Sequence, residues 1–289
     1  MGYMHIDNLY KNIEILMFKE CYALEKIHGT SANVTWKDEQ VVLHSGGEKH
    51  SRFELLFDIE KLKSKFQELF DGDVILFGEA YGGKQQGMSE TYGKELKFIV
   101  FDVKVGDTWL NVINAEDVAK KFELEFVSYN QIPCDLTYIS RERDTISIQA
   151  KRNGIKEDKP REGIVIRPLE ECTNNRGNRI IVKHKGDEFM ETKTKREVNP
   201  EKVKILKESN AIADEWVTPM RLNHVLDKLG NPNDMKETKN VITAMIEDVY
   251  REAKGEIEES QNVKKSIGIK TVALYKKSIS KVLEDENEN

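Results

Sequence analysis

The sequence has few cysteines, few prolines and no long apolar run. Cys21, Cys134 and Cys172 are far apart and odd in number, so they predict neither a disulfide framework nor a zinc ribbon and fit a reducing, cytoplasmic setting. No apolar stretch approaches the roughly 18 residues of a membrane span, and polar and acidic residues interrupt the start of the chain, where a signal peptide needs an unbroken apolar segment. We therefore expect a protein that is neither secreted nor bound to a membrane.

The chain also lacks an excess of positive charge. Its 289 residues carry 45 Lys and Arg against 51 Asp and Glu, a net charge of −6, which excludes a basic coat that binds nucleic acid non-specifically. With 38% hydrophobic and 33% charged residues the composition is that of a soluble globular protein, and the length predicts about two domains. A polyanion site must be local, and residues 176–207 carry ten basic residues against five acidic ones.

Apolar patterning changes near residue 190. Before it, short runs of Val, Ile and Phe predict strands at Val74–Phe77, Lys97–Val105, Gly163–Arg167 and Arg179–Lys183. Helical spacing predicts helices at Asp58–Phe70, Ala115–Phe122, Glu201–Trp216, Pro219–Leu229, Lys236–Lys254 and Val263–Leu283. The stretch Thr192–Pro200 lacks apolar periodicity and is expected to be a linker, and Glu284–Asn289 is expected to be a frayed acidic tail.

One short segment has a pattern suited to covalent chemistry. Lys26 stands three residues before Gly29, after a stretch that is mostly apolar. A lysine attacks phosphorus only through its deprotonated amine, and a glycine lets the backbone come close to a phosphate. A lysine followed by a glycine at this spacing also fits an ordinary surface turn, so the segment alone does not decide.

Four further segments follow in a fixed order. They are Phe77-Gly78-Glu79, Lys97-Phe98-Ile99-Val100-Phe101-Asp102, Glu162-Gly163-Ile164-Val165-Ile166-Arg167 and Val182-Lys183-His184-Lys185. Together with the lysine segment they resemble motifs I, III, IIIa, IV and V of the covalent nucleotidyltransferases. The segment Lys26-Ile27-His28-Gly29-Thr30 is similar to motif I of the RNA ligase 2 family of bacteriophages and their relatives.

The resemblance implies an α+β fold in two domains. Residues 1–195 would form a nucleotidyltransferase (adenylyltransferase) domain of ATP-grasp-like antiparallel sheets flanked by helices. Residues 200–289 would form a small all-α C-terminal domain, because Val217 to Leu226 resembles the opening of the helical domain in full-length members. The domain junction is where the excess of basic residues lies.

The activity implied is that of an ATP-dependent RNA ligase. Such an enzyme seals 3′-hydroxyl and 5′-phosphate RNA ends, here nicks in duplex RNA or an RNA–DNA hybrid, through a lysyl-AMP intermediate and an RNA-adenylate, with ATP and Mg²⁺ or Mn²⁺. We expect a monomer in the cytoplasm of a bacterium or a phage-infected host cell. A DNA ligase, a capping-type guanylyltransferase and an inactive protein that binds nucleic-acid ends stay open as alternatives on the same fold.

The resemblance also implies roles for individual residues. Lys26 would be the nucleophile and Glu162 the support for the metal. Lys183 and Lys185 alternate along an expected strand, so both side chains point to one face, where they could neutralise the α-phosphate. The ATP-binding set implied is Glu25, Ile27, Gly29, Glu79, Phe101 and Asp102, together with Lys183 and Lys185.

Three positions depart from the family pattern. Ser31 stands where members commonly have asparagine, and Arg167 where they commonly have lysine; arginine keeps the charge and offers a fork that matches phosphate. The arginine that helps members to recognise the 5′-phosphate has no direct counterpart. His44 is the nearest match by context, and Arg52 is close enough to replace it.

Overall fold

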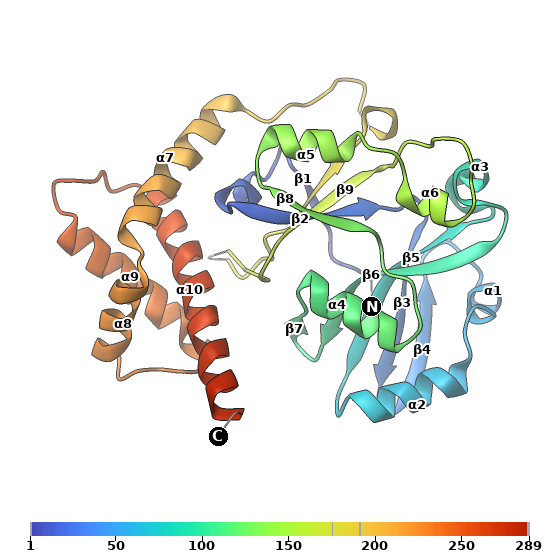
Figure 1. Ribbon diagram of the computed structural model, residues 1–289, viewed down its shortest axis with the longest axis horizontal. Helices are drawn as coiled ribbons and strands as arrows, with labels where there is room; N and C mark the ends of the chain where they lie inside the picture. The colour runs from blue at the N-terminus through green and yellow to red at the C-terminus, as the bar shows by residue number, and fades with distance from the viewer. Residues whose placement is uncertain (1, 175, 191, 288–289) are drawn as a thin grey trace. The chain divides into compact units, whose positions relative to one another are not determined.

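The structure, a computed structural model, describes residues 2–174, 176–190 and 192–287 (Figure 1). The chain divides into two compact units. The first consists of Met1–Glu171 with Ile181–Arg196, and the second of Cys172–Ile180 with Glu197–Asn289.

Within the described residues, the strands of the first unit form two sheets. The first sheet has the order β1-β10-β9-β2-β8, with β1 parallel to β10 and the other neighbours antiparallel; the second has the order β4-β3-β5-β6-β7 and is antiparallel. The strands are β1 (Asp7–Asn8), β2 (Glu20–Lys26), β3 (Thr30–Lys37), β4 (Gln40–Ser45), β5 (Val74–Gly82), β6 (Leu96–Val105), β7 (Thr108–Trp109), β8 (Tyr129–Pro133), β9 (Gly163–Pro168) and β10 (Val182–Lys185).

Helices flank both sheets. They are η1 (Glu14–Met17), α1 (His50–Glu54), α2 (Ile59–Leu69), η2 (Gln85–Gly87), α3 (Ser89–Tyr92), α4 (Val112–Lys121), α5 (Leu136–Arg143), α6 (Ile148–Arg152) and η3 (Asp187–Phe189). Helix α2 shows why they form: Asp58 caps it by accepting a hydrogen bond from the Lys61 amide, and Leu62 and Phe66 are buried one turn apart. Phe66 packs on Trp36 of β3, with ring centroids 5.6 Å apart, so this helix covers the second sheet.

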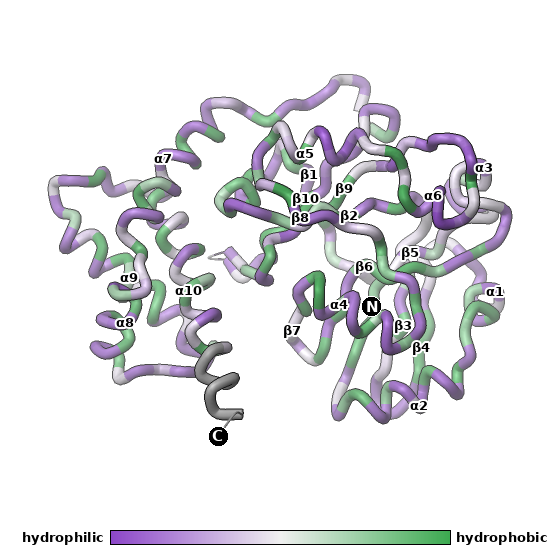
Figure 2. The backbone as a smooth tube through the Cα atoms, viewed as in Figure 1, coloured by the Kyte–Doolittle hydropathy of each residue, from purple (hydrophilic) through white to green (hydrophobic). Residues whose placement is uncertain are grey.

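In the described part of the second unit, the regular elements are helices, apart from the isolated bridge between Thr173 and Arg179. Its helices are α7 (Pro200–Trp216), α8 (Pro219–Lys228), η4 (Met235–Glu237), α9 (Thr238–Glu252) and α10 (Gln261–Asn287). Pro200 and Pro219 each occupy the first turn, where proline costs no hydrogen bond. Figure 2 shows apolar and polar stretches alternating along α7, α8 and α9, which is the pattern of helices buried on one side.

The α+β organisation agrees with the sequence analysis, but three local expectations were wrong. The strand expected at Arg179–Lys183 is β10 at Val182–Lys185, because Ile180 and Ile181 are buried without pairing in a ladder. The strand expected to end at Phe77 continues to Gly82, so Glu79 lies inside β5. The acidic tail is helical through Asn287, and its last two residues lie outside the described part.

Among the described residues, no helix is long and apolar enough to cross a membrane.

Candidate active site

Lys26 is the last residue of β2, and a tight turn leads from it to β3. Gly29 makes this turn possible: a Cβ there would lie 2.3 Å from the carbonyl oxygen of Ala80. The Gly29 amide donates a hydrogen bond of 3.1 Å to Glu79 Oε1 on β5. The turn therefore links the first sheet, which holds Lys26, to the second sheet, which holds Glu79.

Strand register brings the basic residues together around one carboxylate. Gly163 of β9 pairs with Lys26 of β2 on one side and with Lys185 of β10 on the other. Glu162, the residue before Gly163, accepts a hydrogen bond of 2.8 Å from Lys26 Nζ and lies 3.1 Å from Lys185 Nζ. A side chain at position 163 would not fit, because its Cβ would lie 2.3 Å from the His184 carbonyl oxygen.

His28 completes this cluster, and the sequence analysis assigned it no role. Its Nδ1 lies 3.2 Å from Glu162 Oε2, and its ring meets Phe189 edge-on at 5.6 Å. Burial opposes ionisation of Glu162, whose side chain is 1% exposed, but the hydrogen bond from His28 and the charge of Lys26 outweigh it and lower its pKa to about 2. Glu162 is therefore ionised at neutral pH, and its carboxylate contacts the side-chain nitrogens of Lys26, His28 and Lys185.

Glu79 has the opposite electrostatic character. Burial raises the pKa of Glu79 to about 7, even though Lys26 and the Gly29 amide act to lower it, and the negative charge of Glu162 adds to the increase. The two carboxyl groups beside Lys26 therefore differ at neutral pH, because one is ionised and the other is near its titration midpoint.

Replacing Glu79 by glutamine should stabilise the protein at pH 8 and change it little at pH 5. The carboxyl pKa rises from 4.5 to about 7 on folding, so the folded chain holds more protons in that window and stability falls as pH rises through it. The partly exposed side chain reduces the effect to ~1 kcal/mol, or roughly 2–4 °C in calorimetric melting temperature. In the control Glu68→Gln, on an exposed glutamate of α2, the difference in melting temperature from the parent protein should be the same at both pH values. A pH-independent difference for Glu79→Gln contradicts the expectation.

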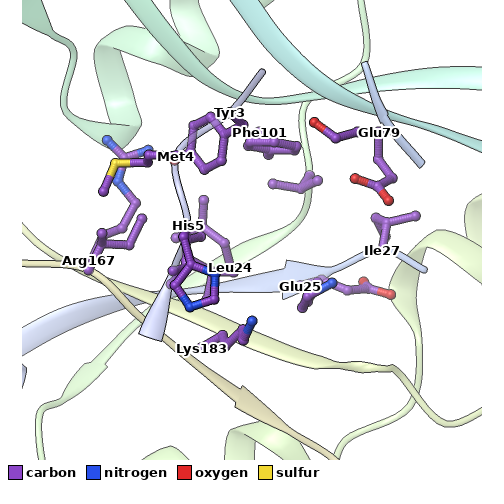
Figure 3. Close-up of a pocket in the computed structure, with 16 residues that line it drawn as sticks. Tyr3, Met4, His5, Leu24, Glu25, Ile27, Glu79, Phe101, Arg167 and Lys183 are labelled. Atoms are coloured by element: carbon purple, nitrogen blue, oxygen red, sulfur yellow. The ribbon is translucent and has the colours of Figure 1, made fainter. Parts of the chain in front are cut away.

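A pocket of about 410 Å³ opens beside Lys26, between the two sheets of the first unit (Figure 3). This volume lies in the range of small-molecule sites. Of the residues expected to bind or react with ATP, those that line it are Glu25, Lys26, Ile27, Glu79, Phe101 and Lys183. Glu162, Lys185, Gly29 and Asp102 are not among its lining residues.

The side chain of Glu25 is buried against the start of α6. It accepts hydrogen bonds from the hydroxyls of Ser128 and Ser147 and from the amides of Ile148 and Gln149. Glu25 is 2% exposed, and its carboxylate caps the first turn of α6. Its role is to hold the strand next to Lys26 in place.

Arg167 is engaged with protein groups, so its fork is not extended toward a phosphate as the sequence suggested. Its Nη1 donates a hydrogen bond of 3.0 Å to Asp102 Oδ1, and its Nε donates one of 2.9 Å to Glu171 Oε1. Its Nη2 donates a hydrogen bond of 2.6 Å to the carbonyl oxygen of Leu110. Arg167 and Asp102 are both buried. Asp102 also accepts a hydrogen bond from the hydroxyl of Tyr3.

The two candidates for 5′-phosphate recognition lie outside the pocket lining. His44 is exposed on β4, where it pairs with Asn33 of β3. Arg52 lies on α1, half-exposed, with NH1 3.3 Å from Glu48 Oε1. Neither residue therefore lines the pocket beside Lys26.

One wall of the pocket had no signal in the sequence. Tyr3, Met4, His5 and Ile6 line it, although this segment has neither a motif nor an apolar period. Its proximity to Asp102, 99 positions along the chain, depends on tertiary structure alone.

Two comparisons with known proteins found matches, one to a family model and one to solved structures of similar fold. The family model described as RNA ligase matches residues 19–185. No curated protein sequence matches the chain. Among solved structures, variants of Naegleria gruberi RNA ligase are similar in fold: one with AMP and Mn (TM-score 0.51, 18% identity, 65% of this chain and 57% of that chain), one without ligand (0.51, 19%, 65% and 56%) and one with ATP and Mn (0.51, 18%, 66% and 57%). The match thus spans a little over half the length of those proteins.

Proposed function

This chain belongs to the RNA ligase family, and on that premise we propose that it is an ATP-dependent RNA ligase that acts through a lysyl-AMP intermediate. The observation that carries the proposal is Lys26 at the edge of a pocket with Glu79, Phe101 and Lys183 in its walls. Such an arrangement places a candidate nucleophile, a flat apolar surface and a cation around one small-molecule site.

The lining of the pocket suits both the base and the ribose of a nucleotide. Phe101 of the second sheet and Val165 of the first both line it, and an adenine ring stacks favourably on such surfaces. Ile27 and Glu25 border the same space, and Glu79, which also lines it, would bind the ribose hydroxyls. Asp102 would contribute to base binding indirectly, through the position of Phe101, the residue before it.

The proposed reaction has three steps. Lys26 Nζ attacks the α-phosphorus of ATP; a phosphorus–nitrogen bond forms, the bond to pyrophosphate breaks and the amine proton passes to solvent. AMP then moves from Lys26 to the 5′-phosphate of an RNA end, and a 3′-hydroxyl displaces AMP to form the phosphodiester. Lys183 and Lys185 supply positive charge for the phosphate oxygens.

Two acidic residues beside the pocket would contribute to a divalent-cation site, although the described residues include no group of three His, Cys, Asp or Glu side chains placed to hold a metal. Glu162 and Glu79 offer carboxylate oxygens, which Mg²⁺ and Mn²⁺ bind together with phosphate oxygens and water. Both Glu162 oxygens lie within 3.2 Å of Lys26, His28 or Lys185, so Glu162 would have to exchange partners to hold a metal. The ion, when bound, would neutralise charge on the triphosphate.

We further propose the RNA substrate and its binding regions. Residues 1–195 would act as the adenylyltransferase domain and residues 200–289 as a helical domain that holds nicked duplex RNA or an RNA–DNA hybrid. His44 and Arg52 would contact the 5′-phosphate from outside the pocket, since both are exposed. The enzyme would act as a cytoplasmic monomer.

Labelled nucleotide tests the function directly. Purified protein is incubated with α-labelled ATP or GTP and Mg²⁺ or Mn²⁺, denatured and resolved by electrophoresis, and a parallel sample receives a duplex nicked in an RNA strand. We expect label from ATP on the protein, its transfer to the nick and a sealed strand. Label from GTP alone would indicate a capping-type enzyme. Absence of label, with intact mass unchanged by pyrophosphate, would overturn the proposal.

A further inference from the structure

The segment before β1 crosses the pocket from one sheet to the other. At its end, Asp7 and Asn8 pair with Val182 and Lys183 of β10, so the segment is anchored beside a pocket lysine of the first sheet. At its start, Tyr3 packs on the second sheet, with ring centroids 4.9 Å from Phe101 and 5.1 Å from Phe77. The residues between line the pocket.

Tyr3 is held by more than ring contacts. Its hydroxyl donates a hydrogen bond of 2.6 Å to Asp102 Oδ2, and Arg167 NH1 lies 3.0 Å from the other oxygen, Oδ1. Asp102 follows Phe101 directly and is fully buried. The hydroxyl, the carboxylate and the guanidinium therefore connect the N-terminal segment, β6 and β9 at the position of the Phe101 ring.

Tyr3 also lies at a defined end of the pocket. Figure 3 shows Tyr3 next to Phe101, with Lys183 on the other side of the space. Tyr3 meets the Phe101 ring edge-on, at an interplanar angle of 79°. An edge contact of this kind restrains the tilt of the partner ring and leaves part of its face available for stacking.

We propose that Tyr3 is a positioning residue for the base of the nucleotide: it orients Phe101 for stacking, and the Tyr3–Ile6 segment forms a wall of the base site. This inference rests on the proposed function and names a residue that the family motifs do not contain. Its consequence is selective, since Tyr3 should affect binding of the base and not binding of the phosphates or the chemical step.

Binding measurements in the Lys26→Ala background, where no covalent step intervenes, test this inference. Calorimetry would compare Tyr3→Ala, Tyr3→Leu and Tyr3→Phe with the parent for two probes, ATP and inorganic tripolyphosphate. We expect Tyr3→Ala and Tyr3→Leu to raise the Kd for ATP about three- to tenfold, which is the change that corresponds to the free energy of an aromatic edge contact. The Kd for tripolyphosphate should stay within about twofold, and Tyr3→Phe, which keeps the ring, should retain most of the ATP affinity.

Tyr138→Ala is the matched control, because Tyr138 is 49% exposed on α5 and lies outside the pocket lining. With Lys26 intact, the Tyr3 variants should raise KM for ATP in protein adenylation and leave kcat within about twofold. Unchanged ATP affinity in Tyr3→Leu, or an equal loss for ATP and tripolyphosphate, would overturn the inference. If the parent bound neither ATP nor tripolyphosphate, the proposed function itself would fail.

Discussion

Replacing Lys26 by alanine should abolish formation of covalent protein–AMP. Alanine has no amine to form the phosphorus–nitrogen bond, and Lys183 and Lys185, the other lysines assigned to the site, lie on a different strand. Adduct formation should fall below detection in the labelled-ATP assay, a loss of at least about 10⁴-fold. Sealing of a nick that carries a preformed RNA-adenylate tests whether the later steps are retained.

The same change should leave the fold intact. Glu162 keeps Lys185 at 3.1 Å and His28 at 3.2 Å after Lys26 is removed, so its buried charge is still paired. The control Lys37→Ala, on an exposed lysine at the end of β3, should form the adduct at the parental rate. A folded Lys26→Ala protein that still forms covalent AMP would remove Lys26 as the nucleophile.

Glu162→Gln should reduce adenylation by about 10²–10³-fold. The side chain is 1% exposed and serves Lys26, Lys185 and His28 together. Glutamine has one acceptor oxygen in place of two and directs an amide donor at an ammonium group, which leaves buried positive charge uncompensated. Removing one partner of a buried ion pair costs about 3–5 kcal/mol. We expect part of this lost interaction energy to appear as a displacement of the Lys26 amine from its reactive position. Single-turnover adenylation rates measure the effect.

The stability of this variant should depend on pH in a specific direction. The pKa of Glu162 is lowered from 4.5 to about 2, so its contribution to stability is complete above pH 4.5 and disappears as pH falls toward 2. Wild type should therefore exceed Glu162→Gln at pH 7 and approach it near pH 3 in urea denaturation. Glu157→Gln, on an exposed loop glutamate, is the control. Normal adenylation by Glu162→Gln would show that Lys26 does not need the carboxylate of Glu162.

Local sequence signals predicted some elements well and others poorly. Helix α2 was predicted because its capping residue, Asp58, and its apolar residues lie within one short window. The strand β10 was placed three residues too early, because an apolar run reports burial, and Ile180 and Ile181 are buried without belonging to the ladder. Strands β2, β3 and β4 were not predicted, although along β3 the buried residues Ala32, Val34 and Trp36 alternate with polar ones.

Sequence motifs alone indicated the family and several residues of the site. Lys26, Glu79, Phe101 and Lys183 line the pocket, and Glu162 contacts Lys26; all five stand in short motifs whose order and residue types are visible along the chain. Such motifs are local, because each consists of a strand end or turn and the residues next to it. Their chemistry could therefore be inferred before any contact between them was known.

Contacts between distant parts of the chain came from the tertiary structure. Glu162 meets Lys26 from 136 positions away, and Tyr3 meets Asp102 from 99 positions away. The first contact depends on the register of β2 and β9 within the first sheet, where a shift of one residue would turn Lys26 to the other face. The second contact depends on the packing of the N-terminal segment on the second sheet. Sequence spacing does not encode that register, so the ionised state of Glu162, the capping role of Glu25 and the N-terminal wall of the pocket could not be read from it.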